Sequence, residues 1–316
     1  MQGNVPKRIS FVHTNRIMLR IIIFILFFLI IPSVNSRAYH PYILVVQSMG
    51  IAPYNEAAAG FRTAIEGNGR RAGYAVISVN EADQAIRERK PDLILAVGAE
   101  ALRKVKKYHH IPFVYLMVLN PNSILSHERN VAGVSMAASP EKQLSAMRRV
   151  LPDARRIGVV YDPGKSGEFV KRSVVSARAL SMEIRAKEVT SPREVPQSLQ
   201  AMKGTVDAIW MIPDTTAITP DTVEAMMLFS MRNGIPVCAF SAKYVGAGAL
   251  MSVDASPFDM GRQAGEMAAR ILSGANTADF KAAEAEHTVL TVNETVLRKL
   301  RLKMSDEVRA RARIVR

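Results

Sequence analysis

Short β-branched runs alternate with longer amphipathic stretches along most of this chain. Residues 43–47 form a continuous apolar run, as in a strand covered on both faces, and residues 55–66 follow with apolar positions at helical spacing. The rest of the first half predicts strands at 74–79, 93–97 and 113–119 and helices at 82–89 and 99–107. Strands separated by helical stretches predict βαβ units and a parallel sheet.

The same order of elements then starts again. The pattern predicts strands at 157–161, 183–189, 208–212 and 236–240 and helices at 168–180, 192–202 and 219–232. Residues 43–46 align with residues 157–160, and residues 91–95 align with residues 206–210. A repeat of about 115 residues predicts an α/β protein with two similar Rossmann-like lobes, each built on its own parallel sheet.

Three extended segments are predicted to join the two lobes. Residues 131–136 read as a strand that crosses between them, residues 249–253 cross back, and residues 287–292 cross a third time. We therefore expect an N-terminal lobe from residues 39–133 with 254–280, and a C-terminal lobe from residues 134–253. A closing strand, helix and tail follow at 281–316. The helix at 258–272 adjoins the return crossing, so it belongs either to the N-terminal lobe or to the hinge.

Residues 1–38 do not fit the folded body. Basic residues, among them Arg16 and Arg20, precede an apolar run at 21–31, and small residues follow at Ser36 and Ala38. This order is typical of a secretory signal peptide, and the run is short for a membrane span. The competing interpretation is an uncleaved anchor, because the basic region is long. No cysteine lies near the segment, so we do not expect a lipid anchor.

Charge and cysteine content exclude several classes of partner. The chain has 42 Lys and Arg against 28 Asp and Glu, a formal net charge of +14, with aromatic residues at only 6%. The basic residues are scattered over predicted helix faces rather than gathered on one stripe between aromatics, so we expect solvated faces and no nucleic-acid partner. A single cysteine, Cys238, permits neither an intrachain disulfide nor a cysteine-based zinc site.

Small polar residues follow nearly every predicted strand. In an open parallel sheet, ligands bind beyond the carboxyl ends of the strands. The residues at these positions are Ser48, Ala99, Glu100, Asn120, Asp162, Ser166, Asp214, Thr215 and Ser241. Helix N-termini there would attract a ligand carboxylate, and the Asp162 and Asp214 carboxylates could hold an ammonium group. The same residue types also serve as N-caps and turn formers, and both roles stay open.

Signals of catalysis are weak. His109 and His110 lack further metal ligands at fixed spacing, and Ser135 and Ser241 lack the glycine-elbow context of a hydrolase nucleophile. The glycines near residue 67 follow a helix rather than a strand, unlike a dinucleotide-binding loop. We therefore expect no enzyme, no metal site and no cofactor.

Several segments together resemble one known family. They are the stretch Leu151-Pro152-Asp153-Ala154-Arg155-Arg156-Ile157-Gly158-Val159-Val160-Tyr161-Asp162-Pro163-Gly164, then 130–135, 246–252 with 261–268, and 290–300. They resemble, in this order, the entry to the second lobe, the crossover strand, the return crossing with its helix, and the closing strand and helix of ABC-transporter substrate-binding proteins of the tryptophan and tyrosine type. The resemblance spans about residues 42–310.

The resemblance implies a type I periplasmic binding protein fold with three crossovers. The implied ligand loops carry Ser48 with Tyr54, Ala99 and Glu100, Asn120, Asp162, Asp214 with Thr215, and Ser241. Two loops depart from the usual family pattern: residues 119–122 are not a Ser-Asp-Pro-type loop, and residues 165–167 are not Asn-rich. Both departures argue against an aromatic amino acid as the ligand.

We therefore expect a monomeric periplasmic protein that closes on a small polar, amino-acid-like ligand. It would deliver this ligand to an ABC permease with a cytoplasmic ATPase, and would contact the membrane only through the permease or an uncleaved signal. The alternative is the same body anchored by residues 21–34 and reporting a ligand to a signalling partner. The mature N-terminus, measured by mass spectrometry, separates the two hypotheses.

Overall fold

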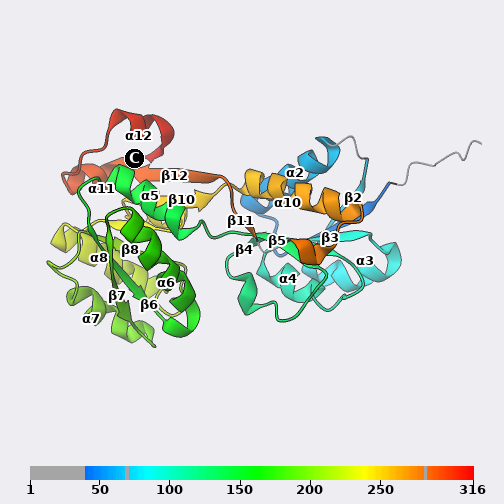
Figure 1. The fold of residues 1–316 in the computed structure, drawn as a ribbon, viewed down its shortest axis with the longest axis horizontal. Coiled ribbons are helices and arrows are strands. Elements are labelled where there is room, and N and C mark those ends of the chain that lie inside the picture. Colours follow the sequence, from blue (N-terminus) through cyan, green and yellow to red (C-terminus); the bar gives the residue numbers. More distant parts are fainter. Residues whose placement is uncertain (1–39, 68–70, 281–282) are drawn as a thin grey trace, which may run out of the picture. The chain divides into compact units, whose positions relative to one another are not determined.

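The computed structural model describes residues 40–67, 71–280 and 283–316. The predicted signal segment, residues 1–38, lies outside these ranges. In the described chain, the helices and strands form two α/β bodies, each around one sheet (Figure 1). None of the described helices is long and apolar enough to cross a membrane.

The first sheet has the strand order β11-β5-β4-β3-β1-β2. Its strands are β1 (Tyr42–Gln47), β2 (Gly73–Ser78), β3 (Leu93–Val97), β4 (Phe113–Val118), β5 (Val131–Ser135) and β11 (Ala283–Glu284). All of its pairings are parallel. Its helices are α2 (Ala52–Gly67), α3 (Ala82–Arg89), α4 (Ala99–Val105) and α10 (Pro257–Leu272).

Alternating residues of β1 show how this sheet is covered on both faces. Ile43 and Val45 pack into a core with Phe61 of α2 and Ala264 of α10. Leu44 and Val46 point the other way, into a core with α3 and α4. These four consecutive side chains alternate between two buried layers. All four are therefore apolar, and the strand appears in the sequence as a continuous apolar run.

The second sheet has the strand order β13-β12-β10-β9-β8-β6-β7. Its strands are β6 (Arg156–Tyr161), β7 (Glu183–Glu188), β8 (Ala208–Trp210), β9 (Val237–Ala239), β10 (Met251–Ala255), β12 (Thr288–Asn293) and β13 (Arg313–Val315). Its helices are α5 (Pro140–Val150), α6 (Pro163–Ala179), α7 (Val195–Gln200), α8 (Pro220–Asn233), α9 (Ala242–Gly246), α11 (Glu294–Lys299) and α12 (Asp306–Arg311).

The internal repeat predicted from the sequence corresponds to a repeated topology. In each sheet the first strand of its half, β1 or β6, lies between the second and third strands of that half. The expected α/β class with two Rossmann-like lobes is therefore confirmed. One expectation is wrong in part: β10 pairs with β12 antiparallel, so the second sheet is mixed rather than wholly parallel.

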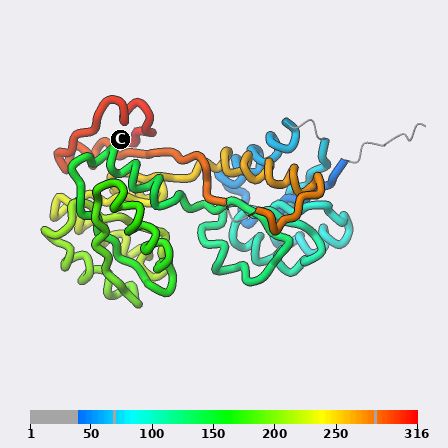
Figure 2. Tube along the Cα trace, in the orientation of Figure 1, coloured from blue at the N-terminus to red at the C-terminus, as the bar shows by residue number. Residues whose placement is uncertain are grey.

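The predicted crossover strands do not themselves cross between the sheets. β5 pairs in the first sheet through Ser135, while β10 and β12 pair in the second. The chain changes sheet in short segments beside these strands, at residues 136–139, 256 and 285–287, and Figure 2 shows the three passages. A strand must pair along its length to satisfy its backbone groups, so the change of sheet falls outside it. We propose these segments as the lobe boundaries.

Helix α10, whose lobe the sequence left open, packs along α2 (Figure 1). A Cβ atom on Gly261 would overlap the backbone carbonyl of Ala57, and one on Gly60 would overlap the carbonyl of Phe258. The two helix backbones are therefore in direct contact through glycine. Residues 257–272 thus pack against the first sheet, although they follow a strand of the second.

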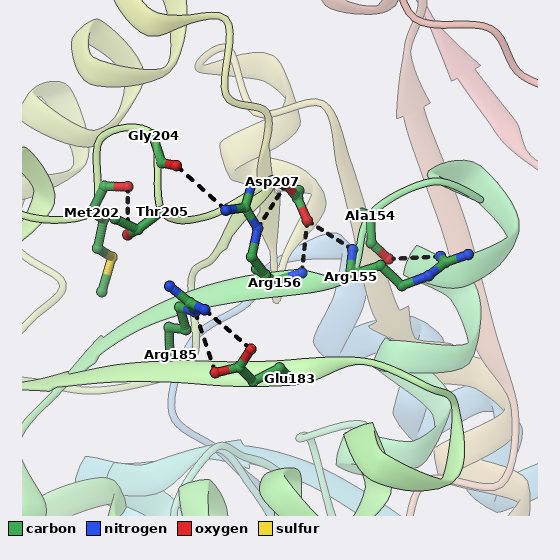
Figure 3. A network of polar contacts seen from close by, with 9 residues as sticks. All are labelled: Ala154, Arg155, Arg156, Glu183, Arg185, Met202, Gly204, Thr205 and Asp207. Carbon is green, nitrogen blue, oxygen red and sulfur yellow. Dashed lines mark hydrogen bonds and ion pairs between the residues drawn. The ribbon is translucent and has the colours of Figure 1, made fainter.

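A polar network fixes the start of the second sheet (Figure 3). Asp207 Oδ2 accepts hydrogen bonds from the backbone N–H groups of Arg155 at 2.9 Å and Arg156 at 2.8 Å. Asp207 Oδ1 pairs with the Arg156 guanidinium at 2.6 Å. Hydrogen bonds from Arg156 hold the pKa of Asp207 at about 2. The carboxylate thus sets the register of β6 beside β8.

Candidate functional site

Two candidate site residues of the first sheet, Ser48 and Tyr54, lie close to Gly98 at the start of α4. Gly98 has a φ of +96°, and a Cβ there would lie 2.5 Å from Ser48 Oγ and 2.8 Å from the Tyr54 hydroxyl oxygen. Ser48 Oγ accepts a hydrogen bond of 2.9 Å from the Ala101 N–H. Ser48 therefore caps the N-terminus of α4. Gly98, the residue that precedes the helix, has no side chain that could do so. Burial raises the pKa of Tyr54, which packs beside this corner.

The next two candidates lie in the first turn of α4. Ala99 is partly buried, whereas Glu100 is exposed and pairs with Arg103 at 2.5 Å. An exposed pair one turn apart contributes little to stability. Glu100 therefore lies on the outer face of the helix.

Asp162 and Asp214 are joined by a hydrogen bond from the backbone of Asp162 to the side chain of Asp214. Asp214 is 2% exposed; its Oδ1 accepts from the N–H groups of Thr216 at 2.9 Å and Ala217 at 2.8 Å. Its Oδ2 accepts from the Asp162 N–H at 2.9 Å. Both oxygens of Asp214 thus bind backbone N–H groups, which favours the turn-forming role that the sequence left open.

Asp162 caps the helix that follows β6. Its side chain accepts hydrogen bonds from the Thr216 hydroxyl at 2.7 Å and from the Gly164 N–H at 2.9 Å, and these two bonds lower its pKa. The cap starts α6 at Pro163, five residues before the predicted start at 168. The neighbouring candidate Thr215 is exposed.

Ser241 precedes α9 and adjoins a carboxylate that the sequence did not single out. Asp254, in β10, accepts hydrogen bonds from the Ala242 N–H at 2.7 Å and from the Ser252 hydroxyl at 2.5 Å. Burial is the largest influence on Asp254 and raises its pKa, although hydrogen bonds from Ser252, Ala242 and Ser241 oppose the shift. This cluster stabilises the carboxyl end of β10 at a passage between the sheets.

One cavity of about 300 Å³ is lined by residues at the carboxyl edges of both sheets, in loops, in helix α6 and at the end of β11. The lining residues are Leu119, Asn120, Pro121, Asn122, Ser135, Ala137, Ala138, Lys165, Ser166, Glu168, Phe169, Arg172, Pro213 and Glu284. They follow or end β4, β5 and β11 of the first sheet and β6 and β8 of the second. We call this cavity the carboxyl-edge pocket.

Two cavities of larger volume lie at the opposite edges of the sheets. One of about 480 Å³ is lined by His109 and residues 126–130, which precede β4 and β5. One of about 470 Å³ is lined by residues 150–154 with Asp207, which precede β6 and β8. Since open parallel sheets bind ligands at their carboxyl edges, the carboxyl-edge pocket is the better candidate despite its smaller volume.

Two of the ten sequence-predicted site residues line the carboxyl-edge pocket: Asn120, which is exposed, and Ser166, which is 7% exposed. The other eight do not belong to its described lining; they are Ser48, Tyr54, Ala99, Glu100, Asp162, Asp214, Thr215 and Ser241. Several of these hold the ends of the strands and helices that carry the lining residues. A polar residue directly after a strand is therefore predicted to lie at the carboxyl edge of the sheet. Its position in the sequence does not show whether it caps a helix or lines the pocket.

The charged lining residues come from one face of α6 and from β11. Arg172 pairs with Glu284 at 2.6 Å, and Glu168 pairs with Lys171, which is not in the lining, at 2.6 Å. Lys165 contributes a second, exposed cation. The pocket thus offers both signs of charge, as recognition of a zwitterion requires.

The single tryptophan of the chain is connected to the pocket wall. The ring of Trp210 packs against the ring of Phe169, with 5.6 Å between centroids. Its Nε1 donates to Gln143 Oε1 at 2.9 Å, and Gln143 Nε2 donates to the carbonyl of Ala138 at 2.8 Å. Phe169 and Ala138 line the pocket while Trp210 is 1% exposed, so the indole lies directly behind the wall.

Four lining residues are not among the site residues that the sequence predicts: Lys165, Glu168, Phe169 and Arg172. Their spacing along α6 is the signal that could have identified them, because residues three and four apart share a helix face. No comparable signal marks Glu284, which enters the pocket from a distant segment. Among the described residues, no group of three or more His, Cys, Asp or Glu side chains could hold a metal ion.

Comparison with known proteins identifies a matching family. Residues 72–316 match the family model described as ABC transporter substrate binding protein. The tyrosine-binding protein of Clostridioides difficile (strain R20291) is 25% identical over 222 residues, which are 67% of this chain and 63% of that protein. The match thus spans less than two thirds of the relative's length.

Solved structures share the fold at low sequence identity. The ligand-free, open structure of a substrate-binding protein with adhesive properties from Clostridium difficile has a TM-score of 0.71 and 23% identity, and the match covers 87% of this chain and 99% of that one. A domain from Streptococcus pneumonia in complex with L-Trp has a TM-score of 0.61 and 18% identity, covering 88% and 100%. Both likenesses support the type I periplasmic binding protein fold.

Proposed function

Since this chain belongs to the family of ABC transporter substrate-binding proteins, we propose that it captures a small polar, amino-acid-like ligand in the carboxyl-edge pocket. The family is one of substrate-binding transport proteins and not of enzymes. The lining of that pocket by residues at the carboxyl edges of both sheets is the observation that carries the proposal. A ligand bound there would contact both lobes at once.

Hinge closure is the proposed mechanism. Three short passages join the sheets, so the lobes can rotate without rearranging either core. A ligand that contacts both linings binds more tightly when they are close, and this differential affinity shifts the protein towards the closed form. The closed form would then present both lobes to the permease, whose cytoplasmic ATPase drives transport.

An amino-acid-like ligand fits the lining and the relatives. The pocket combines Lys165 and Arg172 with Glu168 and Glu284, next to the apolar ring of Phe169. The relatives are a protein named for tyrosine binding and a domain in complex with L-Trp. The loop departures at 119–122 and 165–167 lead us to include non-aromatic amino acids and small organic acids in any screen.

A periplasmic location is part of the proposal. Residues 1–38 have the composition of a secretory signal, and the family's proteins act outside the cytoplasm. Mass spectrometry of the exported protein should find a mature N-terminus near residue 39. An intact Met1 would instead favour the anchored sensing protein.

A ligand screen followed by a blocking variant tests the function. A ligand present at 100 times its Kd should add about 2.7 kcal/mol to the free energy of unfolding, which a thermal-shift panel detects. Asn122 is exposed and lines the pocket, so Asn122→Trp should weaken binding of the best hit by about tenfold or more. Ser123→Trp is the matched control, since Ser123 is exposed in the same turn but outside the lining. Equal effects of the two variants would contradict this location.

A further inference from the structure

The ion pair between Arg172 and Glu284 has both of its partners in the lining of the carboxyl-edge pocket. Arg172 lies on α6, which packs with the second sheet, and Glu284 lies in β11, which pairs with β5 of the first. The atoms Nη2 and Oε1 are 2.6 Å apart, and the side chains are 52% and 40% exposed. A pair this exposed contributes at most about a fivefold bias to any equilibrium, so another carboxylate can replace Glu284 at low cost.

The segment that carries Glu284 is held independently of the ion pair. Lys142 Nζ donates to the carbonyls of Ala285 at 2.5 Å and Glu286 at 2.7 Å. On the other side, Gln263 Nε2 donates to the carbonyl of Glu284 at 3.1 Å. The backbone beside the pocket therefore stays in place when the Glu284 side chain leaves Arg172.

Arg172 has the geometry of a carboxylate receptor. Its guanidinium can form two parallel hydrogen bonds with a carboxylate, which an ammonium group cannot. Glu141 Oε2 lies 3.9 Å from Arg172 Nη2, and Glu141 Oε1 accepts a hydrogen bond from Ser176, so this second protein carboxylate already has a partner. Glu284 is thus the group with which a ligand would compete.

Resting on the function proposed above, we infer that Arg172 binds the carboxylate of the ligand and that Glu284 is its exchangeable substitute. The exchange would transfer Arg172 from a protein partner to the ligand. It would also make the pocket discriminate between an acid and its amide. Arg172 is then a specificity-determining residue. A ligand carboxylate must interact with Arg172 more strongly than the Glu284 carboxylate does.

Isothermal titration of the purified protein with L-tyrosine and L-tyrosinamide tests this inference, because the two probes differ only in the carboxylate. Arg172→Gln should weaken L-tyrosine binding by about tenfold or more and change L-tyrosinamide binding much less. Arg172→Lys keeps the positive charge but lacks the planar guanidinium with its two parallel donors. Its affinity for L-tyrosine should lie between those of Arg172→Gln and the wild type. Glu284→Gln should strengthen L-tyrosine binding by about two- to fivefold.

Arg178→Gln is the matched control, since Arg178 is an exposed arginine of the same helix and lies outside the pocket lining. Equal loss of both probes in Arg172→Gln, or an equal effect of Arg178→Gln, would overturn the role of Arg172. No gain in Glu284→Gln would overturn the role of Glu284. Wild-type protein that binds only uncharged compounds would overturn the inference and leave the proposed function standing, whereas no binding of any compound in the panel would overturn both.

Discussion

Asp214 illustrates how a polar residue at the end of a strand can serve the backbone alone. The sequence places it where ligands bind, and its carboxylate could have held an ammonium group. In the structure it is 2% exposed, and three backbone N–H groups donate to it. Which atoms a carboxylate binds depends on the turn around it, and no residue pattern specifies this.

Removing this carboxylate should destabilise the second lobe. Asp214→Ala leaves three buried or half-buried N–H groups without their partner, so we expect a loss of about 2–4 kcal/mol in the free energy of unfolding. Urea denaturation measures it. Thr215→Ala, at the exposed neighbouring position, should change stability by less than about 0.5 kcal/mol. A loss of ligand affinity in Asp214→Ala without a loss of stability would instead support direct contact with the ligand.

The Asp207 network makes a specific prediction about pH (Figure 3). Hydrogen bonds from Arg156 keep the pKa of Asp207 at about 2, below the ordinary value of 3.8. A lowered pKa stabilises the fold above the ordinary value, and this contribution is lost as the pH falls through about 2. The stability difference between wild type and Asp207→Asn should therefore be constant above pH 5 and shrink between about pH 4 and 2.

At the scale of elements, the apolar runs in the sequence predict most of the strands. The predicted strand at 93–97 and helix at 82–89 coincide with β3 and α3, because both ends of each are marked by polar or helix-breaking residues. Helix α6 starts at Pro163, five residues before the predicted start at 168. Proline at the first helical position and an Asp N-cap explain the earlier start. The late predicted start leaves Lys165 outside the predicted helix, whereas Glu168, Phe169 and Arg172 lie within it.

The contact between α2 and α10 should be sensitive to a single methyl group. Gly261→Ala places a Cβ against the Ala57 carbonyl, and we expect it to lower the free energy of unfolding by about 1–3 kcal/mol or more. Gly167→Ala is the matched control in α6: its Cβ would meet nothing within 4 Å, so the higher helix propensity of alanine should raise stability by about 0.5–1 kcal/mol. Equal effects in chemical denaturation would contradict direct backbone contact between the two helices.

At the scale of the whole molecule, the internal repeat predicts two lobes, because each half repeats the same order of strands and helices. The polar residues that follow the strands also predict a ligand site at the carboxyl edge of the sheets, where the proposed pocket lies. The sequence does not predict which of these residues line the cavity, since Glu284 and Arg172 are 112 residues apart and meet only in the folded chain. The antiparallel pairing of β10 with β12 likewise arises from a late segment outside the repeat.

A ligand held in the carboxyl-edge pocket should draw the two lobes together. Small-angle X-ray scattering of the purified protein, with and without a saturating concentration of the best compound from the screen, tests this most directly. We expect the radius of gyration to fall on ligand addition, and Asn122→Trp to need at least about ten times more of the compound for the same fall while Ser123→Trp needs no more than the wild type. A saturated wild-type protein with an unchanged radius of gyration would contradict it.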